Sequence, residues 1–598
     1  MGVPEATLEV VQNGLGLIAS PPDKVAVYCG TASKGTYLQP FVFATTTTLT
    51  GSFGCGKGVK AATYSIAKTG GQCVFIRLPK VAVAATKSSV TKVGTGTFVA
   101  TVSGTPLDNY EVIIEFTVGG TIGVAGIFYR YSLDGGETYT TAAALGTATT
   151  IALTGTGMTV NLTATQTVIL ADTASFFSTP ASAAILPITT TRVDASTSVI
   201  TATGSPEDDY EVVFEVLDGG TIGVAGITYR YSLDGGNSWT PKRALGTATS
   251  VELLDGKVES SGITVALAAG TLEALDKAEF DTTAPAWQGS DALAALDLLR
   301  SSSHKWGFLH VVGDANATQC GDVGGKLAEF ASGTRYTWAG LSARAKYTNE
   351  SDTSWTSRLV TNFQAYADDR IAVGAGCARI TCPVTGRRNR RPVMWTAIPR
   401  VLVFGIEVDP GRKLSGPLSS DVAIHDANSA LVEHDARIDP TLHDARFLTY
   451  RTHEGNNGVE PGVFITRGNL MNTEGSDFTR IALRRVMDKG SVIFRSVMAM
   501  QLENGIFVNA AGTPNAGFIR ETDAGKIERE IRTALENELI ANGEASGVQV
   551  KMGRTDPVLT NGGKVTAEVK ITPLGYIDSF EGTISYTNPQ LQSLQEAA

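Results

Sequence analysis

Hydrophobic and polar residues alternate one by one along much of residues 90–283. The segments "YEVIIEF" (Tyr110–Phe116), "GITYRYS" (Gly226–Ser232) and "GITVALAAG" (Gly262–Gly270) follow this period of two and are rich in β-branched and aromatic residues. Gly-Gly and Asp-Gly pairs, which favour tight turns, separate such segments. The pattern predicts antiparallel strands joined by short connections.

The same region contains an internal repeat. Residues 106–149 align without gaps with residues 206–249, and about two-thirds of the positions are identical. Weaker similarity extends upstream, so the units cover roughly residues 90–185 and 190–283. Two units at this period indicate tandem domains, because a solenoid needs at least three stacked units. Strand number and size predict a small β-sandwich for each unit.

Outside the repeats the pattern changes to helical spacing followed by short apolar runs. "KGVKAATYSIAKT" (Lys57–Thr69) predicts a helix that Gly70 and Gly71 end, and "QCVFIRL" predicts a buried strand. Downstream, a helix capped by Ser290 precedes the predicted strand "GFLHVVG". This alternation of helices and strands indicates a sheet covered by helices.

The C-terminal stretch is the most helical. Residues 476–505 carry a helical apolar stripe on a basic background, and residues 522–543 predict a second helix with Asn542-Gly543 as its stop. Two alternating strands follow, "KVTAEVKITPLG" and "IDSFEGTISYTN".

Several of these segments together resemble the tail sheath proteins of contractile phage tails and related injection machines. They are "FGCGKGVKAATYSIAKTGGQCVFIRL" (Phe53–Leu78), "FQAYADDRIAVGAG", "GVEPGVFITRGNLMN" (Gly458–Asn472), and the C-terminal order of helix, "ENGIFVNAAGTPN", helix, "GVQVKMG" and a last pair of strands. The resemblance covers roughly residues 20–85 and 285–590, and it lies mainly in the order of elements. It implies a multidomain α/β (α+β) sheath-like body with two tandem inserted all-β sandwich-like domains.

The expected domain boundaries follow from the repeat and the resemblance. Residues 1–88 form an N-terminal sheath segment, residues 89–186 the first inserted β-domain and residues 187–284 the second. Residues 285–457 form a middle α/β sheath domain, and residues 458–598 a C-terminal sheath domain with a terminal strand arm. The two inserted domains are called the first repeat and the second repeat below.

The resemblance implies a structural function. The subunit would polymerise in six-fold rings, stacked as a helix around an inner tail tube, and contract to drive the tube through the target envelope. The strand-like segments "TLEVVQ" (Thr7–Gln12) and "EGTISYT" (Glu581–Thr587) could complete a neighbour's sheet. Other implied partners are the baseplate and the tail terminator, in a virion assembled in the host cytoplasm. The basic helix at residues 475–503, with Arg484 and Arg485, is a candidate face toward an acidic tube.

An alternative function comes from "YSLDGGNSWT" (Tyr231–Thr240), which fits the Asp-box of bacterial sialidases, and from its near copy "YSLDGGETYT" (Tyr131–Thr140). On that hypothesis the chain is a glycan-binding or glycan-cleaving surface protein. The Asp of such a box is expected to cap a hairpin turn, which is a structural task. A retaining glycosidase needs two carboxyl groups about 5 Å apart. Sialidases also need a cluster of arginines for the substrate carboxylate, and neither repeat has such a cluster.

Composition and charge exclude other classes. A formal net charge of −10 argues against a general nucleic-acid surface, and no apolar run approaches the ~20 residues of a membrane span. The N-terminus has no secretory signal pattern. The basic cluster Arg387–Arg391 is expected to be a solvated loop or a subunit contact. The six cysteines have no CxxC spacing and are expected to be reduced thiols.

Two motifs suggest chemistry. "GSFGCGKG" (Gly51–Gly58) matches a phosphate-binding P-loop up to Lys57, but Gly58 stands where the motif needs Ser or Thr for Mg²⁺. The triple "HDA" at His425, His434 and His443 could bind Zn²⁺ or Mn²⁺ if it converged, yet its nine-residue step favours a solvated connection. We therefore expect no enzyme activity and no catalytic, cofactor-binding or metal residues.

Overall fold

The computed structural model describes residues 22–193, 195–256, 258–418, 422–423, 430–454, 461–513, 515–560 and 563–578. They form a mixed α/β structure, in which the chain divides into two compact units, Met1–Asp488 and Lys489–Ala598. The segments 7–12 and 581–587, predicted to act as exchanged strands, lie outside the described residues.

A six-stranded sheet forms the centre of the first unit. Its order is β2 (Pro40–Phe43), β3 (Cys73–Arg77), β1 (Ala26–Gly30), β25 (Phe308–Asp314), β26 (Ala339–Ser342) and β27 (Ile371–Gly374). All strands run parallel except the edge strand β2. Because β1 pairs with β3 on one side and with β25 on the other, the strand order reverses there, as in doubly wound sheets.

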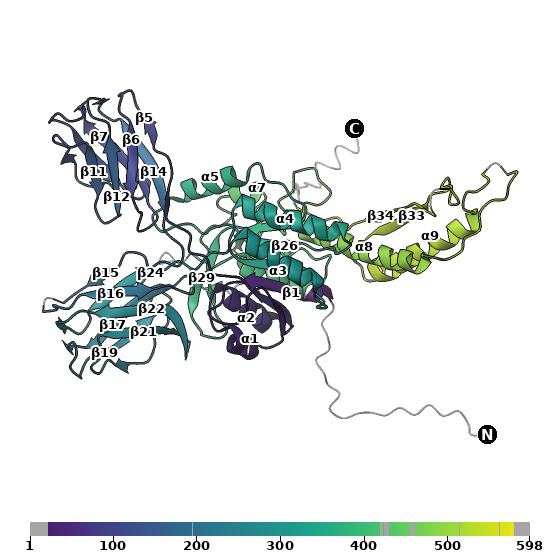
Figure 1. Ribbon diagram of the computed structural model, residues 1–598, viewed down its shortest axis with the longest axis horizontal. Coiled ribbons are helices and arrows are strands. Elements are labelled where there is room, and N and C mark those ends of the chain that lie inside the picture. The colour runs from purple at the N-terminus through teal and green to yellow at the C-terminus, as the bar shows by residue number, and fades with distance from the viewer. Residues whose placement is uncertain are drawn as a thin grey trace, which may run out of the picture. The chain divides into compact units, whose positions relative to one another are not determined.

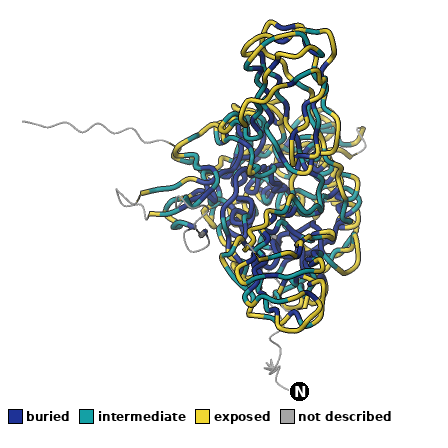
Figure 2. Tube along the Cα trace, turned by 90° about the vertical axis from the view of Figure 1, so that its left-hand side faces the viewer, coloured by how far each residue is buried: buried dark blue, intermediate teal, exposed yellow. Residues whose placement is uncertain are grey.

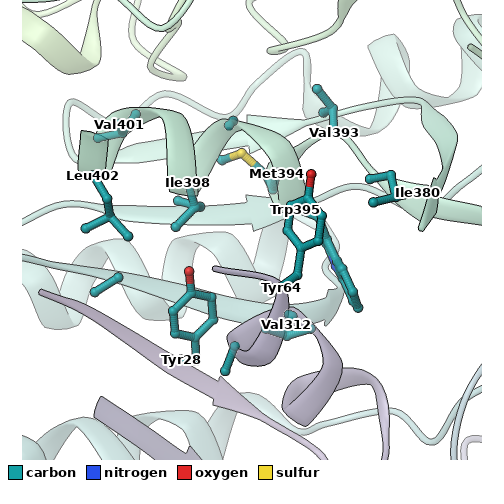
Figure 3. Close-up of a cluster of buried hydrophobic side chains, with 14 of the residues drawn as sticks. Tyr28, Tyr64, Val312, Ile380, Val393, Met394, Trp395, Ile398, Val401 and Leu402 are labelled. Carbon is teal, nitrogen blue, oxygen red and sulfur yellow. The ribbon is translucent and has the colours of Figure 1, made fainter. Parts of the chain in front are cut away.

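Helices cover both faces of this sheet, as the alternation of elements predicts. One face, with Tyr28 of β1, packs against α2 (Lys57–Thr69) and α6 (Met394–Val403), and Figure 3 shows this cluster. The other face, with Val27, packs against helices α3, α4 and α5, whose bounds are Gly289–Ser301, Ala317–Ser332 and Asp352–Phe363. All residues of β1, β3, β26 and β27 are buried, as expected for strands covered on both faces, whereas the edge strand β2 is partly exposed. Figure 2 colours the buried stretches of the chain dark blue.

The predicted helix boundaries are partly confirmed. Helix α2 ends at Gly70, which adopts φ 62° and donates its N–H to Ile66 O. The prediction that Ser290 caps α3 is wrong, because the cap position is Gln288 and Ser290 lies inside the first turn. Before α2, residues Thr46–Phe53 form helix α1, capped by the Thr45 side chain.

In the range 86–281, the residues that the structure describes form strands and turns, with no helix among them. The first repeat contains sheets of order β10-β9-β7-β14-β4, with β5 also on β14, then β11-β12-β6 and β13-β8. The second contains β15-β24-β17-β19-β20, β16-β22-β21 and β18-β23. Figure 1 draws the repeats as separate all-β bodies. Each repeat has its own apolar cluster, around Phe116 in the first and Phe214 in the second.

The strand bounds of the two repeats correspond closely. The first has β4 Thr86–Lys87, β5 Thr91–Val93, β6 Ala100–Gly104, β7 Glu111–Val118, β8 Gly120–Thr121, β9 Phe128–Ser132, β10 Ala143–Ala144, β11 Thr150–Leu153, β12 Met158–Leu162, β13 Thr167–Val168 and β14 Thr173–Thr179. The second has β15 Thr189–Thr191, β16 Ile200–Gly204, β17 Glu211–Asp218, β18 Gly220–Thr221, β19 Thr228–Ser232, β20 Arg243–Ala244, β21 Ser250–Asp255, β22 Glu259–Leu267, β23 Thr271–Leu272 and β24 Lys277–Asp281.

Smaller elements complete the first unit. Strand β28 (Cys377–Thr381) pairs with β29 (Arg388–Pro392) and with β30 (Val422–Ala423). The others are α7 (Thr441–Asp444), β31 (Tyr450–His453), β32 (Gly462–Ile465) and 3-10 turns at Pro22–Lys24 and Lys413–Ser415.

The second unit is an α/β layer. Helix α8 runs from Ile481 to Gln501, and its residues from Lys489 onward belong to the second unit. The helix α9 (Glu521–Leu535) continues into a π-helical turn, Glu536–Ile540. The helix α9 packs through Ile527 and Ile531 beside the antiparallel pair β33 (Gly547–Met552) and β34 (Ala567–Thr572). Both helices were predicted, β33 matches the segment "GVQVKMG" of the resemblance, and β34 lies within the predicted strand "KVTAEVKITPLG". The other predicted strand, "IDSFEGTISYTN", lies outside the described residues from residue 579 onward. Gly543 follows the helical segment with φ 72°.

Candidate functional site at the junction of the repeats and the sheet

Both Asp-boxes are structural turns. In the second repeat, Asp234 Oδ1 accepts hydrogen bonds from Ser232 Oγ (2.7 Å) and Ser238 N (2.8 Å), and Oδ2 accepts one from Ser238 Oγ (2.7 Å). In the first repeat Asp134 accepts the equivalent bonds from Ser132 and Thr138. The prediction that the Asp caps the turn is confirmed.

The aromatic residue of each box stacks on an arginine. The Arg230 guanidinium lies 4.2 Å from the ring centroid of Trp239, and Arg130 lies 4.5 Å from that of Tyr139. Each arginine also pairs with a glutamate of the neighbouring strand, Glu215 or Glu115. One face of each ring is therefore occupied by a guanidinium of the same repeat.

The second repeat is attached to helix α2 and to the β29 segment through buried ion pairs. Arg391 donates to both oxygens of Asp208 at 2.7 and 2.6 Å, and Lys60 Nζ lies 2.8 Å from Asp208 Oδ2 and 2.6 Å from Asp255 Oδ2. Arg387 also pairs with Asp255. Burial alone would raise the pKa of Asp208, but Arg391 and Lys60 outweigh it and hold the pKa well below its usual value.

The interpretation of Arg387–Arg391 as a solvated loop or subunit contact is wrong. This segment is strand β29 with the residue before it, and Arg387 and Arg391 are buried against the second repeat. Two hydrogen bonds between main chain and side chain add to the ion pairs. The Arg388 N–H donates to Asp234 Oδ2 at 2.9 Å, and Asn389 Nδ2 donates to Leu233 O at 2.8 Å. The cluster is therefore an attachment surface within the chain.

The lysine of the P-loop-like motif takes part in the same junction. Lys57 is buried at the start of α2, with its Nζ 2.7 Å from Asp209 Oδ2 and 3.5 Å from Asp314 Oδ1. Desolvation lowers its pKa, but the two carboxylates dominate and raise it. Residues 51–53 of the motif belong to helix α1, whereas a P-loop follows a strand. Lys57 thus holds the second repeat where a P-loop lysine would hold phosphate.

A cavity of about 730 Å³ lies where both repeats meet the sheet. Its charged lining includes Lys57, Asp209, Glu211, Asp281, Asp314 and Arg390. Desolvation in the cavity wall and the Glu211 carboxylate raise the pKa of Asp281 to about 6.

The structure describes two of the three histidines, and these two lie in different surroundings. His425 lies outside the described residues. His434 is buried, with its ring edge-on to Trp355 at 5.8 Å, while His443 lies in α7, its Nδ1 3.5 Å from Asn469 Nδ2. Among the residues that the structure describes, no group of three or more His, Cys, Asp or Glu side chains is arranged to hold a metal ion.

The prediction that Arg484 and Arg485 form a basic helix face toward an acidic tube is wrong. Arg484 is buried and pairs with Asp488 (2.6 Å) and Asp369 (2.9 Å), and Arg485 is buried and donates to Gly405 O at 3.2 Å. Their charges are used inside the first unit. Over the described residues, no helix combines the length and apolar character that crossing a membrane requires.

Sequence reasoning missed the acceptors of this junction. Asp208 and Asp209 lie over 100 residues from Lys57, Lys60 and Arg391, so no local pattern links them. One signal was present: the second repeat has Asp208-Asp209 where the first has Asp108-Asn109. Its hairpin of β21 and β22 is also longer, with strands of six and nine residues against four and five in β11 and β12.

Comparison with known proteins identifies the family of this chain. The model described as DUF2586, N-terminal domain, matches residues 4–467. The chain belongs to this family. The DUF2586 match spans both repeats and the six-stranded sheet, and ends before β33. Among curated proteins, none matches the chain.

Solved structures similar to this DUF2586 chain include sheath proteins, the class that the sequence resemblance names. A sheath tail protein from Desulfitobacterium hafniense has a TM-score of 0.37 at 8% identity, over 96% of this chain and 100% of that one. One from Listeria innocua has a TM-score of 0.37 at 9% identity, over 92% and 95%. The PVC sheath complex of an extracellular contractile injection system has a TM-score of 0.34 at 11% identity, over 49% and 74%. These scores are low, and the function proposed below rests on this chain's own elements.

Proposed function

We propose that the chain is the structural subunit of a contractile tail sheath, which polymerises around an inner tail tube and contracts to drive the tube through the target envelope. The observation that carries the proposal is the pair β33–β34 in the second unit. Within the described residues this sheet has only two strands, so each strand has an edge that no described strand pairs.

Such a sheet is suited to accept strands from neighbours. Val550 and Met552 are buried on one face, beside α9, while Gln549 and Lys551 are exposed on the other. A two-stranded sheet is marginally stable alone, and added strands would supply main-chain hydrogen bonds. The chain's own sequence offers two strand-like segments for this purpose, Thr7–Gln12 and Glu581–Thr587.

Strand exchange of this kind would link subunits while leaving each body free to rotate. A ladder of main-chain bonds tolerates rigid-body reorientation of the domains at its ends. We infer six-fold rings stacked as a helix, with the inner tube, the baseplate and the tail terminator as further partners. The location would be the virion tail, after assembly in the host cytoplasm, and the role would be mechanical, without a catalytic step.

The domain organisation belongs to the same proposal. Residues 1–88, 285–457 and 458–598 would form the sheath body, and residues 89–186 and 187–284 two tandem inserted β-sandwich domains. The separate apolar clusters around Phe116 and Phe214 support two independent cores. Attachment through the ion pairs of Asp208 and Lys57 supports insertion into the body without a shared core.

Truncation combined with electron microscopy tests the proposal. Purified full-length chain is expected to form rings or tubes. Deleting residues 1–15 or 580–598 is expected to leave a folded monomer, whereas a matched control that lacks only residues 589–598 keeps Glu581–Thr587 and should still polymerise. Tubes formed by the 580–598 deletion, or a monomeric full-length chain under all assembly conditions, would contradict the proposal.

A further inference from the structure

The same surface of the two repeats is covered in one and partly open in the other. We define the docking face as Asp208, Tyr210, Tyr231, Leu233 and Asp234 in the second repeat, and as Asp108, Tyr110, Tyr131, Leu133 and Asp134 in the first. In the second repeat all five residues are buried, each with at most 1% of its surface exposed. In the first repeat all five are only half-buried. The two faces are similar in sequence, so the difference in burial comes from the segment of the α/β body that packs against the second repeat.

Strand β29 is what covers the face of the second repeat. Arg391 binds Asp208, Asn389 donates to Leu233 O and the Arg388 N–H donates to Asp234 Oδ2. An extended segment thus binds the docking face through one guanidinium group, one main-chain N–H and one side-chain amide. Such charge-assisted and main-chain contacts give orientation as well as affinity.

In the described part of the chain, the α/β body contacts the first repeat at an edge next to its docking face. Ser354 Oγ and Arg358 bind Glu111, and Asn349 Nδ2 donates to Asn109 O at 3.0 Å. Among the described residues no lysine or arginine pairs with Asp108 or Asp134, and the adjacent Leu107 is 50% exposed. Desolvation raises the pKa of Asp108, as expected for a half-buried carboxyl group without a cation.

We propose that the docking face of the first repeat is an interaction surface for another protein, and that its occupant is an extended, arginine-bearing segment that binds as β29 binds the second repeat. The arginine would pair with Asp108, a main-chain N–H would bind Asp134, and a side-chain amide would bind Leu133 O. Tyr110 and Tyr131 add the half-exposed aromatic surface that is enriched at binding hot spots. This inference does not depend on the sheath function.

A peptide copied from this chain tests the surface. The probe is the labelled peptide of residues 385–393, "TGRRNRRPV", added to the full-length protein and followed by fluorescence anisotropy. It is expected to bind at one site, and more weakly as salt is raised. The same peptide with the R391Q substitution should bind at least tenfold more weakly.

Protein variants locate the contact. Asp108→Asn should weaken peptide binding at least tenfold, because the cation loses its partner. Glu137→Gln removes the same charge from an exposed position of the same Asp-box hairpin and should change affinity less than twofold. Hydrogen exchange should show protection at residues 107–111 and 131–136, with no change at residues 207–211 and 231–236.

The opposite results are equally clear. Absence of binding by the wild-type protein, equal binding by Asp108→Asn, or protection appearing in the second repeat would each overturn the proposal. A concentration-dependent dimer that Asp108→Asn abolishes, without peptide binding, would also overturn it and assign the face to a second copy of this chain.

Discussion

Glu111 and Glu211 occupy the same position in the two repeats, and each forms an ion pair with an arginine from the α/β part of the chain. Arg358 Nη2 lies 3.3 Å from Glu111 Oε1, and Arg379 Nη2 lies 2.6 Å from Glu211 Oε2. The two arginines come from unrelated elements, helix α5 and strand β28. Each repeat is thus anchored by an equivalent carboxylate beside its Asp-box turn. The second repeat is held by the buried ion pairs of Asp208 and Asp255 as well.

This difference predicts unequal effects of equivalent substitutions. Asp208→Ala leaves Arg391 buried without a carboxylate, which should lower the free energy of unfolding by about 3–5 kcal/mol. Asp108→Ala removes a carboxyl group without a cation and should cost less than about 1 kcal/mol. Urea unfolding followed by far-ultraviolet circular dichroism measures both variants, whereas tryptophan fluorescence would not report on the first repeat, because all six tryptophans lie in residues 239–395. Equal shifts for the two variants would argue against the buried network as the main attachment.

Lys57 should matter for stability and not for nucleotide binding. Lys57→Met separates Asp209 and Asp314 from their cation; since both carboxylates reach solvent, the expected cost is about 1–2 kcal/mol. Calorimetry with ATP and Mg²⁺ should detect no binding to the wild type or to the variant. ATP binding that Lys57→Met abolishes would restore the P-loop hypothesis.

His310 makes the first unit acid-sensitive. Burial lowers its pKa to about 4, and its Nδ1 lies 3.0 Å from Gly340 O. The unfolded chain takes up this proton near the ordinary pKa of about 6.5. Stability is therefore lost as pH falls from about 6.5 to 4, by up to about 3 kcal/mol. In urea titrations at pH 7 and pH 4.5, His310→Asn should lose less stability on acidification than the wild type. Equal losses would assign the acid sensitivity to other groups.

Sequence patterns predicted the elements that depend on local chemistry. The helix at Lys57–Thr69 with its Gly70 stop, the buried strand after it, and the hairpins of the repeats follow from periodicity and from residues with special turn geometry. The Asp-box turns were predicted as structural for the same reason, because their bonds join residues at most four positions apart.

Long-range charge pairing was not predictable in this way. Arg387–Arg391 has the composition of a solvated loop, and only the partners Asp208 and Asp255, brought close by the fold, make it a buried strand. Arg484 and Arg485 were misjudged for the same reason, since Asp369 and Gly405 O lie far away in sequence. Periodicity describes which face is apolar, but it does not identify the partner of a buried charge.

The cavity at the junction should give a pH effect of the opposite sign to that of His310. The pKa of Asp281 is raised to about 6, so the folded chain holds this proton more tightly than the unfolded chain does. The ionised carboxylate therefore disfavours the folded state, and stability falls as pH rises from about 4 through 6. Asp281→Asn removes that penalty. At pH 7 it should stabilise the first unit by no more than about 1 kcal/mol, because the side chain is accessible to solvent, and at pH 4 it should have no effect. The difference between variant and wild-type unfolding midpoints at the two pH values isolates this group, and a gain confined to pH 4 would reverse the assignment.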